Sequence, residues 1–143
     1  MNTLRHILLV EDSPRDAELT MSALKRVVAN EIVHLKDGAE ALDYLFRRGD
    51  YASRANELPG VILLDLKMPK VDGYDVLREV KSDPALKKIP VVIMTSSREE
   101  QDLVRSYAAG VNAYVVKPLK FPEFAEAVRS LGVFWAAVNV PVP

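Results

Sequence analysis

The stretch Gly60-Val61-Ile62-Leu63-Leu64-Asp65-Leu66 decides the fold class of this 143-residue chain. An apolar run of this length without polar alternation is typical of a strand buried on both faces, as in a parallel sheet. Similar runs alternate with segments of helical periodicity, at residues 7–10, 32–35, 91–94 and 113–116. This alternation predicts repeated βα units and therefore an α/β fold with a doubly wound parallel sheet.

The predicted helices follow the strand-like runs. Ser13 is placed as an N-cap, with Pro14 as the first helical residue and Asp16 as the capping partner. Residues 47–59 form the most polar stretch, which we interpret as a surface insertion before the strand at 61–66. The other helices are expected at residues 38–48, 74–81, 98–109 and 121–136.

The composition is that of an ordinary globular chain, with 49% hydrophobic and 27% charged residues. A formal net charge of −1 without a basic stripe gives no electrostatic case for nucleic acid or anionic membrane as a partner. The absence of cysteine excludes disulfides and thiolate chemistry. No apolar run approaches the roughly 18 residues of a membrane span. Residues 1–5 are too short and polar for a signal peptide, so we expect a cytoplasmic location.

Polar residues follow the apolar runs where each predicted strand ends. The first run ends on Glu11-Asp12, the third on Asp65, the fourth on Thr95 and the fifth on Lys117. In doubly wound folds, ligands bind outside the carboxyl ends of the strands, where the strand order reverses. We therefore expect three carboxylates, a hydroxyl and an ammonium to gather at one edge of the sheet.

The three carboxylates predict a metal site. Close carboxylates repel one another, so they either raise a pKa or attract a cation. Oxygen ligands favour a hard ion such as Mg²⁺. Asp12 and Asp65 would be direct ligands, Glu11 a water-mediated one, and the backbone carbonyl of Lys67 a third protein oxygen. Any one of these acids alone would more often be a solvated strand end, and it is the combination with Thr95 and Lys117 that favours a site.

Asp65 is the candidate nucleophile, because a carboxylate can attack phosphorus to give an aspartyl phosphate. The Thr95 hydroxyl could bond one phosphoryl oxygen, although strand-end hydroxyls often satisfy a nearby backbone group instead. The Lys117 ammonium could pair with another phosphoryl oxygen. Packing alone explains this lysine poorly, because an ammonium at an apolar strand end requires an anion.

These residues resemble the receiver domain of two-component response regulators. The resemblance covers residues 5–132 and rests on five separated motifs in order: Glu11-Asp12, Asp65-Leu66-Lys67-Met68-Pro69, Asp72-Gly73, Thr95-Ser96 and Lys117-Pro118. It implies a flavodoxin-like receiver fold with a five-stranded parallel sheet in the order 2-1-3-4-5. It also implies that a histidine kinase phosphorylates Asp65 with Mg²⁺ as cofactor, and that Thr95 and Lys117 contact the phosphate. Tyr114 stands where the family has a switch aromatic, although a core tyrosine explains it nearly as well.

A narrower resemblance points to the single-domain regulators paired with phytochrome-type histidine kinases. It rests on Arg47-Arg48-Gly49-Asp50-Tyr51, on the segments Asp83-Pro84 and Lys88-Ile89-Pro90-Val91, and on the ending Leu131-Gly132-Val133-Phe134-Trp135. The kinase partner is therefore expected to be of the phytochrome type. Neither the input signal nor the downstream target follows from these residues.

We expect residues 1–136 to form one receiver domain, with residues 137–143 as a C-terminal tail and no effector domain. The output would then be a protein–protein contact. Phe134 and Trp135 belong to an apolar surface wider than one core face needs, which predicts a homodimer through the last helix and tail. The alternative is that these two aromatic residues fold back and close the core.

Two rival functions share the same residues. A receiver-like scaffold that works without phosphorylation would not need all five chemical positions. An aspartate-nucleophile phosphatase usually carries a second acid two residues after the nucleophile, and Lys67 occupies that place. The sequence therefore favours a phosphoacceptor signalling protein, which acts only on its own aspartate, over a turnover enzyme.

Overall fold

The computed structural model describes residues 5–25, 29–55, 57–66, 73–95 and 113–117, with Lys120, Pro122, Glu123 and Glu126. Helices, short 3-10 turns (η) and strands follow in the order β1 Ile7–Val10, α1 Pro14–Lys25, β2 Ile32–Leu35, α2 Gly38–Phe46, η1 Gly49–Tyr51, β3 Val61–Asp65, α3 Gly73–Ser82, η2 Leu86–Lys88, β4 Val91–Thr95 and β5 Ala113–Val116. In these ranges, no helix combines the length and apolar character needed to cross a membrane.

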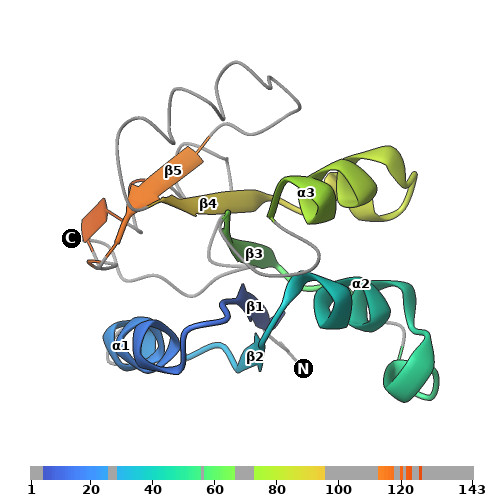
Figure 1. Cartoon of the computed structure of the whole chain (residues 1–143), viewed down its shortest axis with the longest axis horizontal. Helices are drawn as coiled ribbons and strands as arrows, with labels where there is room; N and C mark the ends of the chain where they lie inside the picture. Colours follow the sequence, from blue (N-terminus) through green and yellow to red (C-terminus); the bar gives the residue numbers. More distant parts are fainter. Residues whose placement is uncertain are drawn as a thin grey trace.

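The strands form one parallel sheet in which β1 lies between β2 and β3 (Figure 1). The order β2-β1-β3-β4 confirms the predicted arrangement of the first four strands. In the described part of the chain, β5 lies parallel to β4 at the far edge. The chain reverses its direction of progress across the sheet after β2, so the switch point lies between β1 and β3.

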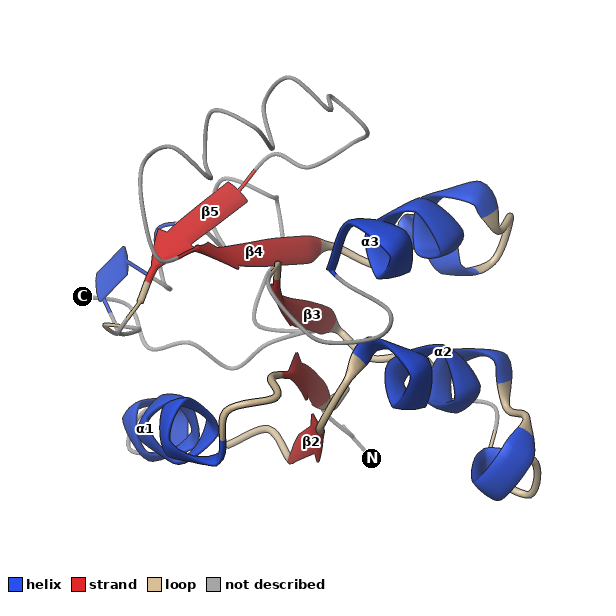
Figure 2. Ribbon diagram, viewed as in Figure 1, coloured by secondary structure: helices blue, strands red, loops and turns tan. Residues whose placement is uncertain are grey.

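Helices cover both faces of the sheet, with α1 on one side and α2 and α3 on the other (Figure 2). The five residues of β3 are all buried, as the predicted strand at 61–66 requires, although the strand ends one residue earlier, at Asp65. Successive side chains of a strand point to opposite faces. The face toward α2 and α3 takes the apolar side chains of Leu8, Val10, Ile62, Leu64 and Ile93. A sheet covered on both sides has its ligand site at a strand end rather than on a face.

The beginning of α1 differs in one respect from the prediction. Ser13 caps the helix as expected, because its Oγ accepts a hydrogen bond from the Asp16 backbone N–H at 3.2 Å. The Ser13 backbone N–H, however, donates to Glu11 Oε2 at 3.2 Å. The side chain of Asp16 instead reaches Lys117. Asp16, the predicted capping partner, therefore contacts Lys117 at the sheet edge. Glu11 accepts the hydrogen bond from the Ser13 N–H in its place.

The helix predicted at 38–48 ends earlier, at Phe46. Asp37 caps its start by accepting a hydrogen bond from the Glu40 N–H at 2.8 Å. Arg47 adopts a left-handed conformation with φ 53°, which terminates the helix. Helix propensity did not predict this helix end, because arginine is a good helix former and a left-handed residue at a helix end is usually glycine.

The polar insertion is anchored to the domain more firmly than a surface loop. Arg54 stacks over the Tyr44 ring at 4.0 Å and donates through Nε to the Tyr44 carbonyl at 3.0 Å. Tyr51 contacts the same ring edge-to-face, with a centroid separation of 5.2 Å. The insertion thus packs against Tyr44 of α2. Its polar composition did not predict these aromatic contacts.

The helix predicted at 74–81 begins one residue earlier and ends one later, at Gly73 and Ser82. The predicted helix at 98–109 lies outside the described residues. So do most of the predicted last helix and the tail. The domain boundary at residue 136 therefore stays a prediction.

Candidate functional site

The register of the strands aligns the predicted site residues at one edge. Val10 of β1 is level with Leu64 of β3, so Glu11 follows at the level of Asp65. Thr95 of β4 is level with Val116 of β5, and Lys117 is the next residue. Parallel strands of matched length thus bring residues more than fifty positions apart in sequence to a common edge.

Glu11 is the most deeply buried member of this group, with a fully buried side chain. Its backbone is tied to the end of β2, since its N–H donates to the Leu35 carbonyl at 3.0 Å. His34 Nε2 lies 2.8 Å from the Glu11 carbonyl oxygen, and because a carbonyl can only accept, the imidazole donates there. Both polar groups of the Glu11 backbone are therefore bonded to residues of β2, which leaves its carboxylate to face the other site residues.

The carboxylates of Glu11, Asp12 and Asp65 form a candidate metal centre. Each offers one oxygen, and these oxygens all lie within 4.8 Å of one another. Asp12 is exposed to solvent, whereas Asp65 is 5% exposed. One open carboxylate beside two buried ones suits Mg²⁺, which keeps several waters and takes only one or two carboxylates directly. A carboxylate oxygen has more than one acceptor position, so the Glu11 carboxylate can also accept a hydrogen bond from a metal-bound water.

The Lys117 side chain reaches back from the end of β5 into the carboxylates. Its Nζ lies 2.6 Å from Glu11 Oε1, 3.0 Å from Asp65 Oδ2 and 3.3 Å from Asp16 Oδ2. Burial alone would lower the pKa of the ammonium, but the hydrogen bonds and charges of Glu11 and Asp65 outweigh it and raise the pKa. Lys117 is therefore a permanent cation, and the anion that its position requires is supplied by the acidic cluster.

The protonation of Glu11 responds to the same environment. Burial raises the pKa of its carboxyl to about 7, the nearby charge of Asp65 adds to this, and the Lys117 ammonium opposes it. A carboxyl with a pKa near neutrality changes its charge in the physiological range. The metal-binding capacity of the cluster should therefore depend on pH.

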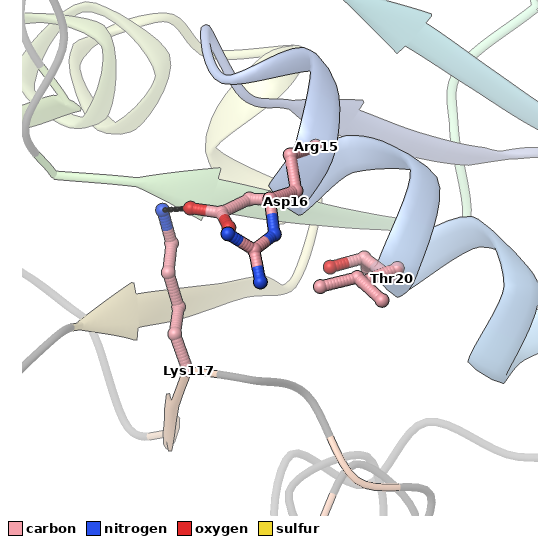
Figure 3. A pocket seen from close by; sticks show the side chains of 5 residues that line it. Arg15, Asp16, Thr20 and Lys117 are labelled. Carbon is pink, nitrogen blue, oxygen red and sulfur yellow. Dashed lines mark hydrogen bonds and ion pairs between the residues drawn. The ribbon is translucent and has the colours of Figure 1, made fainter.

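Asp16 was not among the residues predicted for the site. Figure 3 shows its carboxylate directed at the Lys117 ammonium, from the first turn of α1. Beside this pair lies a cavity of about 250 Å³ lined by Arg15, Asp16, Leu19, Thr20 and Lys117. The position of Asp16 in the sequence could have indicated this contact. It lies in the first turn of the helix that directly follows Glu11-Asp12, and that turn lies at the same edge of the sheet.

Gly73 controls the path of the chain after Asp65. Its N–H donates to the Leu66 carbonyl at 3.0 Å, which closes the connection between β3 and α3. A Cβ at this position would collide with the Asp65 carbonyl oxygen and the Leu66 Cα. The glycine at position 73 therefore has a steric reason, because only glycine allows α3 to start this close to the strand end.

The remaining predicted site residues are placed only in part. Thr95 and Tyr114 lie on β4 and β5, and only their backbones are described. Lys67 and the aromatic pair Phe134 and Trp135 lie outside the described residues. The predicted carbonyl ligand, the switch pair and the dimer surface therefore stay predictions.

Comparison with known proteins identifies the class. The family model of the response regulator receiver domain matches residues 7–129. This chain belongs to that family, and it is accordingly a signalling phosphoacceptor protein of two-component systems rather than a turnover enzyme. The order of the first four strands and the cluster of Glu11, Asp12 and Asp65 agree with what the family resemblance of the sequence implied.

Within the family, the similar proteins include a regulator of the Rcp1 type and a bacteriophytochrome response regulator. The response regulator Rcp1 of Synechocystis sp. is 40% identical over 135 residues, covering 94% of this chain and 90% of Rcp1. The structure of the bacteriophytochrome response regulator AtBRR is 60% identical with a TM-score of 0.90, covering 95% of this chain and 98% of AtBRR. The narrower resemblance read from the sequence is thereby confirmed.

Two further structures concern the chemistry of the site. The phosphorylated cyanobacterial phytochrome response regulator RcpA is 41% identical with a TM-score of 0.73, covering 93% of this chain and 94% of RcpA. The Mn²⁺-bound form of Rcp1 is 38% identical with a TM-score of 0.72, covering 96% of this chain and 99% of that one. Phosphorylation and divalent metal binding thus both occur among the relatives of this chain.

Proposed function

We propose that this protein accepts a phosphoryl group on Asp65 from a histidine kinase of the phytochrome type, in a Mg²⁺-dependent reaction. The observation that carries the proposal is the contact of a strand-end carboxylate with a buried ammonium, Asp65 Oδ2 to Lys117 Nζ at 3.0 Å, beside two further acids. The similarity to phytochrome response regulators supports the kinase type.

The proposed transfer takes place at an Asp65 carboxylate oxygen. That oxygen forms a bond to phosphorus while the phosphorus–nitrogen bond of the kinase phosphohistidine breaks and its electron pair stays with the imidazole. Mg²⁺ held by Glu11, Asp12 and Asp65 would neutralise charge on the phosphoryl oxygens. Lys117 then pairs with a phosphoryl oxygen instead of with the Asp65 carboxylate oxygen that it contacts before the transfer. In a later step, water attacks phosphorus, the bond between phosphorus and the Asp65 oxygen breaks, and inorganic phosphate leaves while Asp65 returns to the carboxylate.

Three further roles belong to the same proposal. The Lys67 carbonyl completes the metal ligands, and the Thr95 hydroxyl bonds a phosphoryl oxygen. Tyr114 changes its packing when Thr95 moves. Their support is the match of these positions to the motifs of the family. The backbone placement of Thr95, one residue past Met94, the register partner of Asp65, is compatible with that role.

For the whole chain, we propose a single receiver domain over residues 1–136 with the full five-stranded order 2-1-3-4-5. Residues 137–143 would form a tail. We further propose output through protein contact, including a homodimer in which Phe134 and Trp135 take part. Sedimentation of the wild type and of Phe134→Ala and Trp135→Ala variants tests the dimer, and an unchanged mass in both variants would refute their role.

One experiment tests the phosphoacceptor proposal directly. The protein is incubated with Mg²⁺ and acetyl phosphate, and its intact mass is measured. We expect one added acid-labile phosphoryl group in wild type and none in Asp65→Asn or in the presence of a metal chelator. A wild type that stays unmodified with acetyl phosphate and with phytochrome-type kinases would instead indicate a phosphorylation-independent scaffold. Continuous turnover of phosphomonoesters would indicate a phosphatase.

A further inference from the structure

The Lys117 ammonium is shared among more acids than the proposed chemistry uses. An ammonium has three N–H donors. Among the residues that the structure describes, three carboxylates contact it, from Glu11 at 2.6 Å, Asp65 at 3.0 Å and Asp16 at 3.3 Å. Glu11 directly follows β1 and Asp65 is the last residue of β3, whereas Asp16 lies in the first turn of α1. A phosphoryl oxygen that needs this ammonium must therefore compete with acids already in contact with it.

The three contacts differ in strength. The Glu11 side chain is fully buried and that of Asp65 is 7% exposed, whereas 41% of the Asp16 side chain is exposed. Contact with water weakens an ion pair, because both charges keep part of their hydration. Asp16 is thus the longest and most solvated of the three contacts. It is the one that the ammonium can release at least cost.

The space beside the pair allows such a release. The cavity of about 250 Å³ is lined by both Asp16 and Lys117, as well as by Arg15, Leu19 and Thr20 of α1. Figure 3 shows the lysine chain crossing toward the helix to meet the carboxylate. Because the cavity adjoins the contact, the two side chains can separate without displacing core residues.

We propose that Asp16 positions Lys117 and competes with the phosphoryl group for its ammonium, thereby lowering the affinity of the site for that group. The inference rests on the proposed phosphoacceptor function. Two effects act in the same direction. Asp16 occupies a donor that a phosphoryl oxygen could use, and its negative charge repels a nearby phosphoryl dianion.

The same contact has the opposite effect on a cation. Without the Asp16 charge, the acids of the described part of the chain that share the ammonium are Glu11 and Asp65, two of the candidate metal ligands. Lys117 would then compete with Mg²⁺ more strongly, and the site would also lose one unit of negative charge. Removal of the Asp16 charge should therefore weaken Mg²⁺ binding while it strengthens the binding of a phosphoryl analogue.

The test uses the full chain and three variants. Asp16→Asn removes the charge with little change of shape, and Asp16→Glu keeps the charge. Glu18→Gln is the matched control, because Glu18 is an exposed acid on the same helix. Calorimetry measures the Kd for Mg²⁺ first, and then the Kd for beryllofluoride, a phosphoryl analogue, at saturating Mg²⁺. Both series are repeated at high salt, which screens partly exposed charges.

We expect Asp16→Asn to bind beryllofluoride about two- to fivefold more tightly and Mg²⁺ about two- to fivefold more weakly than wild type, the range of partly exposed ion pairs. Asp16→Glu should restore both affinities toward wild type, Glu18→Gln should change neither, and high salt should reduce the differences. Equal behaviour of Asp16→Asn and Glu18→Gln, or weaker beryllofluoride binding by Asp16→Asn, would overturn the inference. A wild type that binds Mg²⁺ but no beryllofluoride would overturn the proposed function and the competition with it.

Discussion

The Lys117 ammonium and the Glu11 carboxylate meet at 2.6 Å, in a contact where the acid is fully buried and the lysine is 19% exposed. A buried carboxylate without its cation is costly, because it loses hydration and gains no compensating charge. This pair therefore links the stability of the domain to its candidate chemistry, since the same ammonium also contacts Asp65.

Replacing Lys117 by Met should destabilise the domain more at pH 8 than at pH 5. At pH 8 Glu11 is ionised and loses its partner, which we expect to lower the free energy of unfolding by about 1–3 kcal/mol, below the range for fully buried pairs. At pH 5 Glu11 is largely protonated, because its pKa is raised to about 7. Urea unfolding at the two pH values measures the difference, and an equal loss at both would contradict the role of Glu11.

Replacing Glu11 by Gln should flatten the dependence of stability on pH between 4.5 and 7. Burial raises the pKa of Glu11 from 4.5 to about 7, so in this window the folded protein binds more protons than the unfolded chain. Stability that comes from this group is therefore lost as the pH rises. Metal-free unfolding curves across the window measure the slope. A wild-type slope in Glu11→Gln would show that Glu11 titrates normally.

The affinity for Mg²⁺ should increase as the pH rises from 5 to 8. A protonated carboxyl is a poor metal ligand, and the Glu11 carboxyl loses its proton around pH 7. Calorimetric titrations at several pH values measure the Kd, with Glu11→Gln as the control in which the change near pH 7 should disappear. A pH-independent Kd in wild type would exclude coupling between this proton and the metal.

His6 should make the domain less stable in acid. Burial lowers the pKa of its imidazole, which lies 2.9 Å from the Tyr44 hydroxyl and is 7% exposed. The folded protein therefore binds fewer protons than the unfolded chain around and below pH 6.5, so this part of the stability is lost as the pH falls. Unfolding of His6→Gln between pH 5 and 7 should show a smaller decline than wild type. Tyr44→Phe is the control, because it loses the hydrogen bond but keeps the buried imidazole.

Gly73→Ala should impair both stability and phosphorylation. The added Cβ collides with the Asp65 carbonyl oxygen and the Leu66 Cα, so the end of β3 must shift. We expect a loss of about 1–3 kcal/mol, the range for overpacking. Leu86→Ala is the control, because it removes a buried side chain from η2 without touching Asp65. Phosphorylation by acetyl phosphate should slow in Gly73→Ala but not in Leu86→Ala, and equal rates would contradict the effect on Asp65.

Several features could be predicted because they depend on local patterns. Uninterrupted apolar runs identified β1 and β3, and the polar residue that ended each run identified Glu11 and Asp65. The cap at Ser13 was also local, since it involves residues three positions apart. The left-handed Arg47 was missed, because its backbone conformation is set by packing around α2 rather than by its own preference.

The sequence by itself determined the strand ends, the family, and the acids and the cation at those ends. These features depend on the apolar runs and on the residues that directly follow them, so consecutive residues are enough to predict them. Only the tertiary structure decided how the Lys117 charge is divided. Asp16 and Lys117 lie 101 positions apart, and their 3.3 Å contact depends on the placement of α1 beside the end of β5. Contacts of this kind are set by the packing of a helix on a sheet, and no local pattern encodes them.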